Sequence, residues 1–217
     1  MRQNITLPGK PRSRLGALAR GVRLLYHPRS FLRTTGQLRS FRENQAVDVD
    51  GAPLAWVNYA MLHLLNQRLS DQMRVFEYGC GASTLYFAAR VGQVISVEHN
   101  AEWASAVATE FARLGNVTLT QQTDQEQYIR NIREHAPFDI VLIDGLCRED
   151  CLPVALQCLT HKGVVLLDDS QRPQYQAAMT DAAELGFKRL DLRGPKPVSL
   201  FEAQTTLLYR AENCLGI

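Results

Sequence analysis

The sequence has few of the features that mark membrane-spanning or disulfide-rich proteins. No apolar run approaches the roughly 20 residues that cross a bilayer. The apolar stretch at 15–25 is interrupted by Arg20 and Arg23, which argues against a signal-peptide core. The five cysteines form no C-x-x-C pair, and their odd number favours free thiols over a disulfide framework or a zinc site. We therefore expect an intracellular, cytoplasmic protein.

Acidic residues are scarce at the start of the chain. Residues 1–45 hold ten Lys or Arg and one acid, Glu43, whereas the remainder holds 14 basic and 21 acidic residues. Such a segment suits an anionic membrane surface, a nucleic acid, an acidic partner or, in a eukaryote, a transit peptide. A solvated helical face with no partner is the alternative. Apolar residues recur at helical spacing between the arginines and predict an amphipathic helix: Leu15, Leu18, Val22, Leu25 and Tyr26.

Length and composition fit one catalytic domain with an extension. A chain of 217 residues with 46% hydrophobic content can bury a sizeable core. We expect residues 1–45 to form the basic, helical extension and residues 46–217 to form the domain.

The most informative pattern is Val-Phe-Glu-Tyr-Gly-Cys-Gly-Ala-Ser-Thr at 75–84. An apolar strand runs into Gly79 and Gly81, which lack a Cβ and so permit a sharp turn and close approach of a ligand. The third glycine of dinucleotide-binding turns is absent, because Thr84 stands there. Glu77 would repel a pyrophosphate and attract an ammonium group. A cationic cofactor that carries an amino acid therefore fits better than NAD or FAD.

Residues 77–81 resemble the first motif of class I S-adenosylmethionine (SAM) dependent methyltransferases. Three further motifs follow in the order of that family, at 97–99, 138–145 and 163–169. Arg148, Arg172 and residues 209–210 and 213–217 resemble a poorly characterised bacterial subgroup of the family. The resemblance covers roughly residues 54–213 and implies SAM as the cofactor.

Apolar strands alternate with amphipathic helices along the domain. The pattern predicts an α/β protein with a doubly wound, Rossmann-like, seven-stranded sheet, preceded by N-terminal helices, one of which begins at Pro53. Residues 193–197 join the last two strands without a helix, so we expect a mostly parallel sheet with an antiparallel last strand. The strands are expected near 74–78, 93–98, 116–120, 138–143, 163–167, 186–192 and 204–210.

Ligands bind at the carboxyl ends of the strands in such sheets. The resemblance implies that Glu98 binds the ribose hydroxyls and that Asp124 contacts adenine, although an N-cap is an equal interpretation for Asp124. Ser83 and Thr84 face the cofactor carboxylate or simply cap a helix, and Tyr78 lines the methionine end of the pocket or packs. The expected cofactor-binding residues are Glu77, Tyr78, Gly79, Gly81, Ser83, Thr84, Glu98, His99, Asp124 and Asp144.

Two aspartates are expected to be catalytic. Methyl transfer needs an oriented nucleophile and a group that accepts its proton, and Asp144 and Asp169 follow the fourth and fifth strands. The region also resembles metal-dependent catechol-type O-methyltransferases, which have an Asp-Asn pair where this chain has Asp169 and Ser170. Mg²⁺ held by two carboxylates and waters is therefore an open but not favoured alternative. Arg148 and Arg172 either clamp an anionic substrate or are exposed helix-start arginines.

These features predict a SAM-dependent methyltransferase that acts on a small molecule or glycan precursor, with oxygen favoured as the acceptor atom. One alternative is an aminopropyl-type transferase of the same fold, with Asp168 and Asp169 as slight support. Another is a non-catalytic SAM-binding module docked through the basic N-terminus. Glu77 and Glu98 argue against lost cofactor binding.

Overall fold

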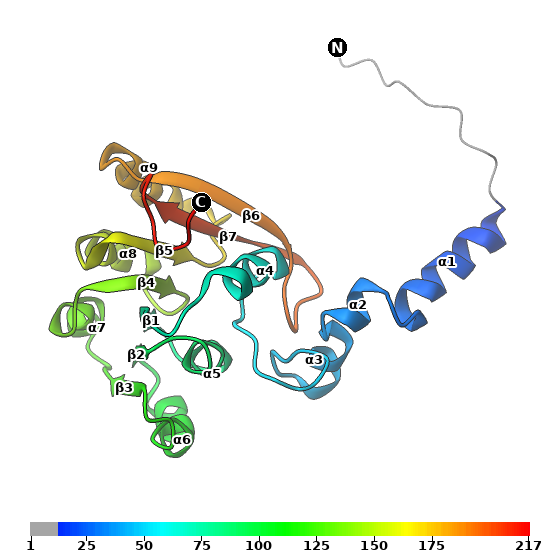
Figure 1. Ribbon diagram of the computed structural model, residues 1–217, viewed down its shortest axis with the longest axis horizontal. Helices are drawn as coiled ribbons and strands as arrows, with labels where there is room; N and C mark the ends of the chain where they lie inside the picture. Colours follow the sequence, from blue (N-terminus) through cyan, green and yellow to red (C-terminus); the bar gives the residue numbers. More distant parts are fainter. Residues whose placement is uncertain (1–12) are drawn as a thin grey trace, which may run out of the picture.

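The computed structural model describes residues 13–217 as a helix-covered sheet preceded by three short helices (Figure 1). The N-terminal helices are α1 (Arg14–Tyr26), α2 (Phe31–Thr34) and α3 (Gln37–Glu43). The elements that follow are α4 (Tyr59–Arg68), β1 (Arg74–Tyr78), α5 (Ala82–Ala88), β2 (Gln93–Glu98), α6 (Ala101–Phe111), β3 (Val117–Gln121), α7 (Gln125–Arg130), η1 (Asn131–Glu134), β4 (Phe138–Ile143), α8 (Arg148–Gln157), β5 (Leu159–Leu167), η2 (Pro173–Tyr175), α9 (Gln176–Glu184), β6 (Lys188–Pro195) and β7 (Glu202–Tyr209).

The seven strands form one sheet in the order β3-β2-β1-β4-β5-β7-β6. Strand β7 runs antiparallel to both β5 and β6, and the other pairs are parallel. The predicted Rossmann-like sheet, mostly parallel with an antiparallel last strand, is confirmed. Tyr78 pairs with Val97 on one side and Ile143 on the other, so β1, β2 and β4 end level with one another. The chain reverses its strand order between β1 and β4, where ligands bind in such sheets.

Apolar side chains fill both faces of the sheet. Phe76 and Tyr78 point into a cluster with α7, α8 and α9, whereas Val75 points into a cluster with α4 and α5. The alternation follows from the two-residue period of a strand. Because helices cover both faces, the central strands are almost continuously apolar, and a buried acid such as Glu77 is conspicuous among them.

Helix α4 begins six residues later than expected, at Tyr59 and not at Pro53. The Asn58 side chain caps it by accepting a hydrogen bond from the Met61 amide at 3.0 Å. The Asn58 amide group also donates to the Leu192 carbonyl on β6 at 2.7 Å, and Pro53 pairs with Val47 in an isolated bridge. The segment before α4 is therefore extended. Strand β5 also differs, because it begins at Leu159 and includes a register shift against β4.

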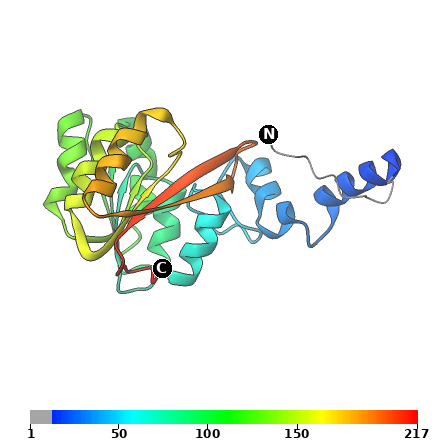
Figure 2. The same ribbon diagram turned by 90° about the horizontal axis from the view of Figure 1, so that it is seen from above.

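The N-terminal helices lie at one end of the molecule, and α1 extends away from the sheet (Figures 1 and 2). The predicted helix at 15–26 is present, with the Ser13 side chain as its N-cap. Helix α3 contacts the β6–β7 loop, where the Gln37 side chain donates to the Ser199 carbonyl at 3.3 Å. The division of the chain at residue 45 stays a prediction. Within residues 13–217, no helix combines the length and apolar character needed to cross a bilayer.

Candidate active site

A cavity of about 1070 Å³ opens at the carboxyl ends of the central strands. The turn at 79–83 and the ends of β2 and β4 form one wall. Residues from 44–56 and from the β6–β7 loop also line it, so segments far apart in the sequence complete the cavity. The position agrees with the rule for open α/β sheets.

Two glycine-containing turns meet at the base of this cavity. Gly79 has φ of +97°, a conformation that L-residues with a side chain rarely adopt. Gly145 faces it after β4, and the Asp144 amide donates to the Tyr78 carbonyl at 3.2 Å. A Cβ on Gly145 would lie 2.9 Å from the Tyr78 carbonyl oxygen and would collide with the Tyr128 hydroxyl. The close approach of the two backbones therefore requires glycine at position 145, whereas position 79 requires glycine for its positive φ.

Glu77 places a buried carboxylate in the cavity wall. It is 1% exposed, and its Oε2 accepts a hydrogen bond from the Ser96 hydroxyl at 3.0 Å. Its Oε1 has no hydrogen-bond partner among residues 13–217. Burial raises the pKa of Glu77 to about 7, against the opposing effect of nearby hydroxyls. A buried acceptor without a donor is costly, so Glu77 suits a ligand that brings an N–H or O–H group.

Glu98 lies at the end of β2 beside the glycine turn. It is 5% exposed, and its two oxygens accept hydrogen bonds from the backbone amides of Cys80 at 3.2 Å and Asn100 at 2.8 Å. His99 Nδ1 also lies 3.0 Å from Oε1. A carboxylate has about four lone-pair sites, so acceptor capacity remains for a ligand. Trp103 donates to the Cys80 carbonyl at 2.9 Å and forms an aromatic rim next to Glu98.

The remaining residues expected to bind cofactor divide into two groups. Gly81, Ser83 and His99 line the cavity with the residues above. Tyr78 lines the cavity with its backbone, because its ring packs in the core and its hydroxyl donates to the Ile129 carbonyl. Thr84 and Asp124 are not among the lining residues. Thr84 accepts from the Gly81 amide, and Asp124 caps α7 by accepting from the Gln127 amide. A contact of Asp124 with adenine stays a prediction.

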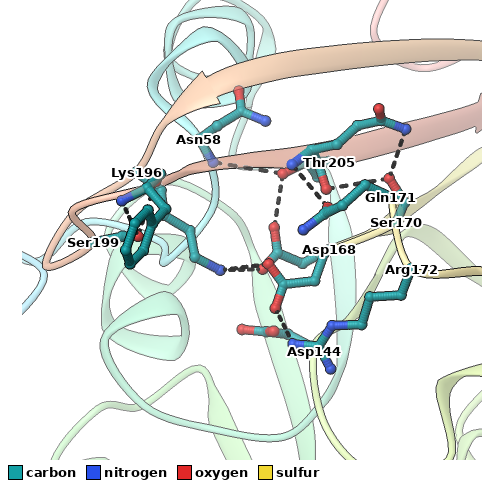
Figure 3. Close-up of polar contacts among 12 residues, drawn as sticks. Asn58, Asp144, Asp168, Ser170, Gln171, Arg172, Lys196, Ser199 and Thr205 are labelled. Atoms are coloured by element: carbon teal, nitrogen blue, oxygen red, sulfur yellow. Dashed lines mark hydrogen bonds and ion pairs between the residues drawn. The ribbon is translucent and has the colours of Figure 1, made fainter.

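Two aspartates, Asp168 and Asp169, contact a lysine at the cavity, and Asp144 lies nearby (Figure 3). The Lys196 ammonium lies 2.8 Å from Asp168 Oδ2 and 3.0 Å from Asp169 Oδ1. Asp168 is fully buried and accepts a second hydrogen bond from the Thr205 hydroxyl at 2.8 Å. Burial lowers the pKa of Lys196, but Asp168 and then Asp169 outweigh that effect and raise it. Lys196 is therefore positively charged at neutral pH.

Asp144 and Asp169 have pKa values that are shifted in opposite directions. Burial raises the pKa of Asp144, and the neighbouring Asp168 carboxylate adds to the rise. Burial also acts on Asp169, but Lys196 and then Arg148 outweigh it and lower its pKa. Both side chains line the cavity. Carboxyl groups whose pKa values diverge in this way suit different roles in proton transfer.

The two arginines expected to bind substrate have different surroundings. Arg148 donates to the carbonyls of Asp144 at 2.9 Å, Gly145 at 3.0 Å and Asp168 at 2.7 Å. Its side chain is 11% exposed and also pairs with the Asp144 carboxylate at 3.0 Å. Arg148 thus ties the turn after β4 to the end of β5. Arg172 is 46% exposed, pairs with Asp169 at 2.7 Å and is not among the lining residues. Substrate contacts by either arginine stay predictions.

Sequence reasoning missed Lys196 and Trp56. Lys196 stands between two prolines in a loop that was expected only to join two strands. The Trp56 ring lies 5.9 Å from the Lys196 ammonium, and both residues line the cavity. The two prolines indicate a stiff loop, but they do not indicate that Lys196 in this loop contacts the aspartates that follow β5. Trp56 lay in a segment that was expected to be helical.

Comparison with known proteins agrees with this fold. Residues 76–170 match the family model described as a methyltransferase domain. No curated protein matches the chain. The central part of the chain is thus similar to a methyltransferase domain, which agrees with the resemblance to class I SAM-dependent methyltransferases.

Three solved structures illustrate the shared fold. A precorrin-6y C5,15-methyltransferase from Geobacter metallireducens has 15% identity and a TM-score of 0.58, with 77% of this chain and 98% of that chain covered. A methyltransferase candidate from Streptococcus mutans, solved with S-adenosylhomocysteine, has 10% identity and a TM-score of 0.51, with 68% and 94% covered. Spermidine synthase from Thermotoga maritima has 13% identity and a TM-score of 0.53, with 70% and 57% covered. At these identities the likeness concerns the fold.

Proposed function

We propose that this protein transfers a methyl group from SAM to a hydroxyl group of a small molecule or glycan precursor. One observation carries the proposal. The wall that presents Glu77 and Glu98 belongs to the same cavity as Asp144, Asp169 and Lys196. A cofactor subsite and a set of charged groups suited to proton transfer therefore share one enclosure.

The cofactor subsite fits SAM in three respects. Glu77 has an unpartnered, buried oxygen for the amino group of the cofactor, and Glu98 has remaining acceptor capacity for vicinal hydroxyls. The conformation of Gly79 lets the backbone approach a ligand closely. When bound, SAM supplies a methyl group that is activated by the positive charge on its sulfur.

Asp144 is the proposed general base. The pKa of this carboxyl group is raised, and 26% of its side chain remains exposed at the cavity, so it can accept the proton of an acceptor hydroxyl. Arg148 fixes its position through the ion pair at 3.0 Å. Asp169 is held ionised by Lys196, Arg148 and Arg172, and it orients the acceptor by receiving a hydrogen bond.

Lys196 provides the positive charge of the transfer centre. Its ammonium group lies within 3.0 Å of both Asp168 and Asp169, and it balances carboxylates that would otherwise repel one another and an acceptor oxygen. We therefore favour metal-independent transfer, in which Lys196 supplies the charge that a divalent cation would bring. Chelation of metals is expected to leave turnover unchanged.

The aminopropyl alternative receives less support from the same contacts. A polyamine substrate would need acidic groups for its ammonium ions. Asp168 and Asp169 already pair with Lys196, and Asp168 also holds Thr205. Their charges are therefore largely satisfied within the protein.

The proposal is tested by labelling with SAM that carries a radioactive methyl group. Extracts fractionated into small molecules, glycan precursors and macromolecules serve as acceptors. We expect label in a low-molecular-mass fraction, and we expect Asp144→Asn and Asp169→Asn to lower labelling far more than they lower SAM affinity or melting temperature. Glu149→Gln, an exposed position on α8, is the control. Labelling at the parent rate by both Asn variants would contradict the site assignment.

A further inference from the structure

Helix α1 exposes a row of apolar side chains to solvent. The exposed fractions are 79% for Leu15, 67% for Leu18 and 67% for Tyr26, and those of Val22 and Leu25 are near one half. These residues recur at helical intervals, so they share one face of a helix that extends away from the sheet (Figure 2). Contiguous apolar surface of this kind marks a place of contact with an apolar partner.

The same segment carries an excess of positive charge. Residues 13–45 contain a single acid, Glu43, and its carboxylate is shared by Arg39 at 2.8 Å and Arg42 at 2.9 Å. The basic residues of this segment are Arg14, Arg20, Arg23, Arg29, Arg33, Arg39 and Arg42. A partner of this segment must therefore be anionic as well as apolar.

A small hollow between α2 and α3 collects three of these arginines. It has a volume of about 280 Å³ and is lined by Arg33 from α2 and by Arg39 and Arg42 from α3, together with apolar residues. The three arginines that line the hollow outnumber the one nearby carboxylate, Glu43, which pairs with Arg39 and Arg42. Arginine pairs with phosphate through two parallel hydrogen bonds, so the hollow suits a phosphate group.

The β6–β7 loop places further apolar residues at the same end of the molecule. Leu200 is 83% exposed and Phe201 is 79% exposed, and both lie at the rim of the main cavity. The loop contacts α3 through the hydrogen bond of Gln37 to Ser199. In Figures 1 and 2 this loop lies close to α3, and α1 extends farther from it.

We propose that α1, α2, α3 and the β6–β7 loop dock on an anionic lipid bilayer. The apolar side chains enter the interface, and the arginines contact lipid phosphates. A nucleic acid would use the arginines but would leave Leu15, Leu18 and Leu200 in water. Docking places the cavity rim beside the bilayer. If the proposed methyl transfer holds, the acceptor is a molecule presented from that surface.

Vesicle sedimentation tests the proposal without a substrate. Vesicles of phosphatidylcholine alone are compared with vesicles that also contain phosphatidylglycerol. We expect binding to the anionic vesicles, weakened by added salt. Leu18→Glu, Leu200→Glu and Arg42→Glu should each lower binding roughly tenfold or more. Leu185→Glu is the matched control and should bind as the parent does, because Leu185 is 66% exposed and caps α9, a helix that lies far from α1 in Figure 1.

Two outcomes would overturn the proposal. They are no binding to either vesicle and equal binding of anionic vesicles by Leu18→Glu and the parent. Tighter binding to an RNA duplex than to anionic vesicles would likewise identify a different partner. SAM calorimetry on the same preparations separates a failure of docking from a failure of the proposed function.

Discussion

The Lys196 ammonium lies 2.8 Å from Asp168 Oδ2, which joins the β6–β7 loop to the carboxyl end of β5. The contact is part of a chain of polar groups from three segments. The backbone N–H of Asn58 donates to the Thr205 hydroxyl at 3.5 Å, and that hydroxyl donates to the Asp168 carboxylate (Figure 3). The loop that forms one wall of the cavity is therefore held by a buried ion pair and not by apolar packing alone. Removal of the lysine should affect the fold and the transfer centre together.

The first prediction concerns Lys196→Met. Loss of the ammonium leaves the buried Asp168 carboxylate unpaired, so the free energy of unfolding should fall by roughly 3 kcal/mol at neutral pH. Thermal denaturation followed by circular dichroism measures the change. Lys188→Met, an exposed position at the start of β6, is the control. Unchanged stability would show that the ion pair does not hold the loop.

The same variant has a signature in its pH dependence. The pKa of Asp169 is lowered in the folded state, so the unfolded state binds more protons in the acid range, and native stability falls as pH falls through the folded pKa. Lys196→Met removes the main cause of this lowering. Its melting temperature should therefore decline less steeply on acidification below about pH 4, as measured by melting at several pH values.

The second prediction concerns the buried Glu77. Its pKa is raised from 4.5 to about 7, so the folded state binds more protons than the unfolded state between these values. Stability should fall as pH rises through that window, by a few kcal/mol in total. Glu77→Gln has no carboxyl group to ionise, so its melting temperature should be flatter with pH and higher than the parent's at pH 8. A parent protein with no loss of stability from pH 5 to 8 would contradict the prediction.

SAM binding should report on the same residue. The ionised carboxylate attracts the amino group of the cofactor, so the parent's affinity should rise as pH increases through about 7. Glu77→Gln should lack this rise and bind roughly tenfold more weakly at pH 8. Fluorescence titration against pH measures both. Identical pH profiles would place the amino group elsewhere.

The third prediction concerns Gly145→Ala. The new methyl group would collide with the Tyr128 hydroxyl and lie 2.9 Å from the Tyr78 carbonyl oxygen, so stability should fall by roughly 1–3 kcal/mol. Gly115→Ala is a matched control, because no atom lies within 4 Å of its Cβ position. Addition of Tyr128→Phe should recover part of the loss. Equal melting temperatures for the two Ala variants would mean that the turns do not approach as described.

Much of the fold could be predicted from the sequence because its signals are local. Strands buried on both faces appear in the sequence as apolar runs. The glycine turn and the acid at Glu98 are each recognised from the few residues next to them in the sequence. The start of α4 could not be predicted, because Asn58 is fixed by a β6 carbonyl 134 residues away. Lys196 was missed for the same reason, since its partners lie 27 and 28 residues earlier. The direction of the Tyr78 ring depends on which sheet face each helix covers.

The most direct test of a SAM site is calorimetry with SAM, S-adenosylhomocysteine and NAD, on the parent, Glu98→Ala and the control Glu102→Ala. Glu102 is exposed on α6, whereas Glu98 is buried in the cavity wall. The account predicts that SAM and S-adenosylhomocysteine bind and NAD does not. It also predicts that loss of the charged acceptor in Glu98→Ala costs roughly 1.5–3 kcal/mol, about ten- to a hundredfold in affinity. Tight NAD binding without SAM binding, or an unchanged SAM affinity in a folded Glu98→Ala variant, would contradict it.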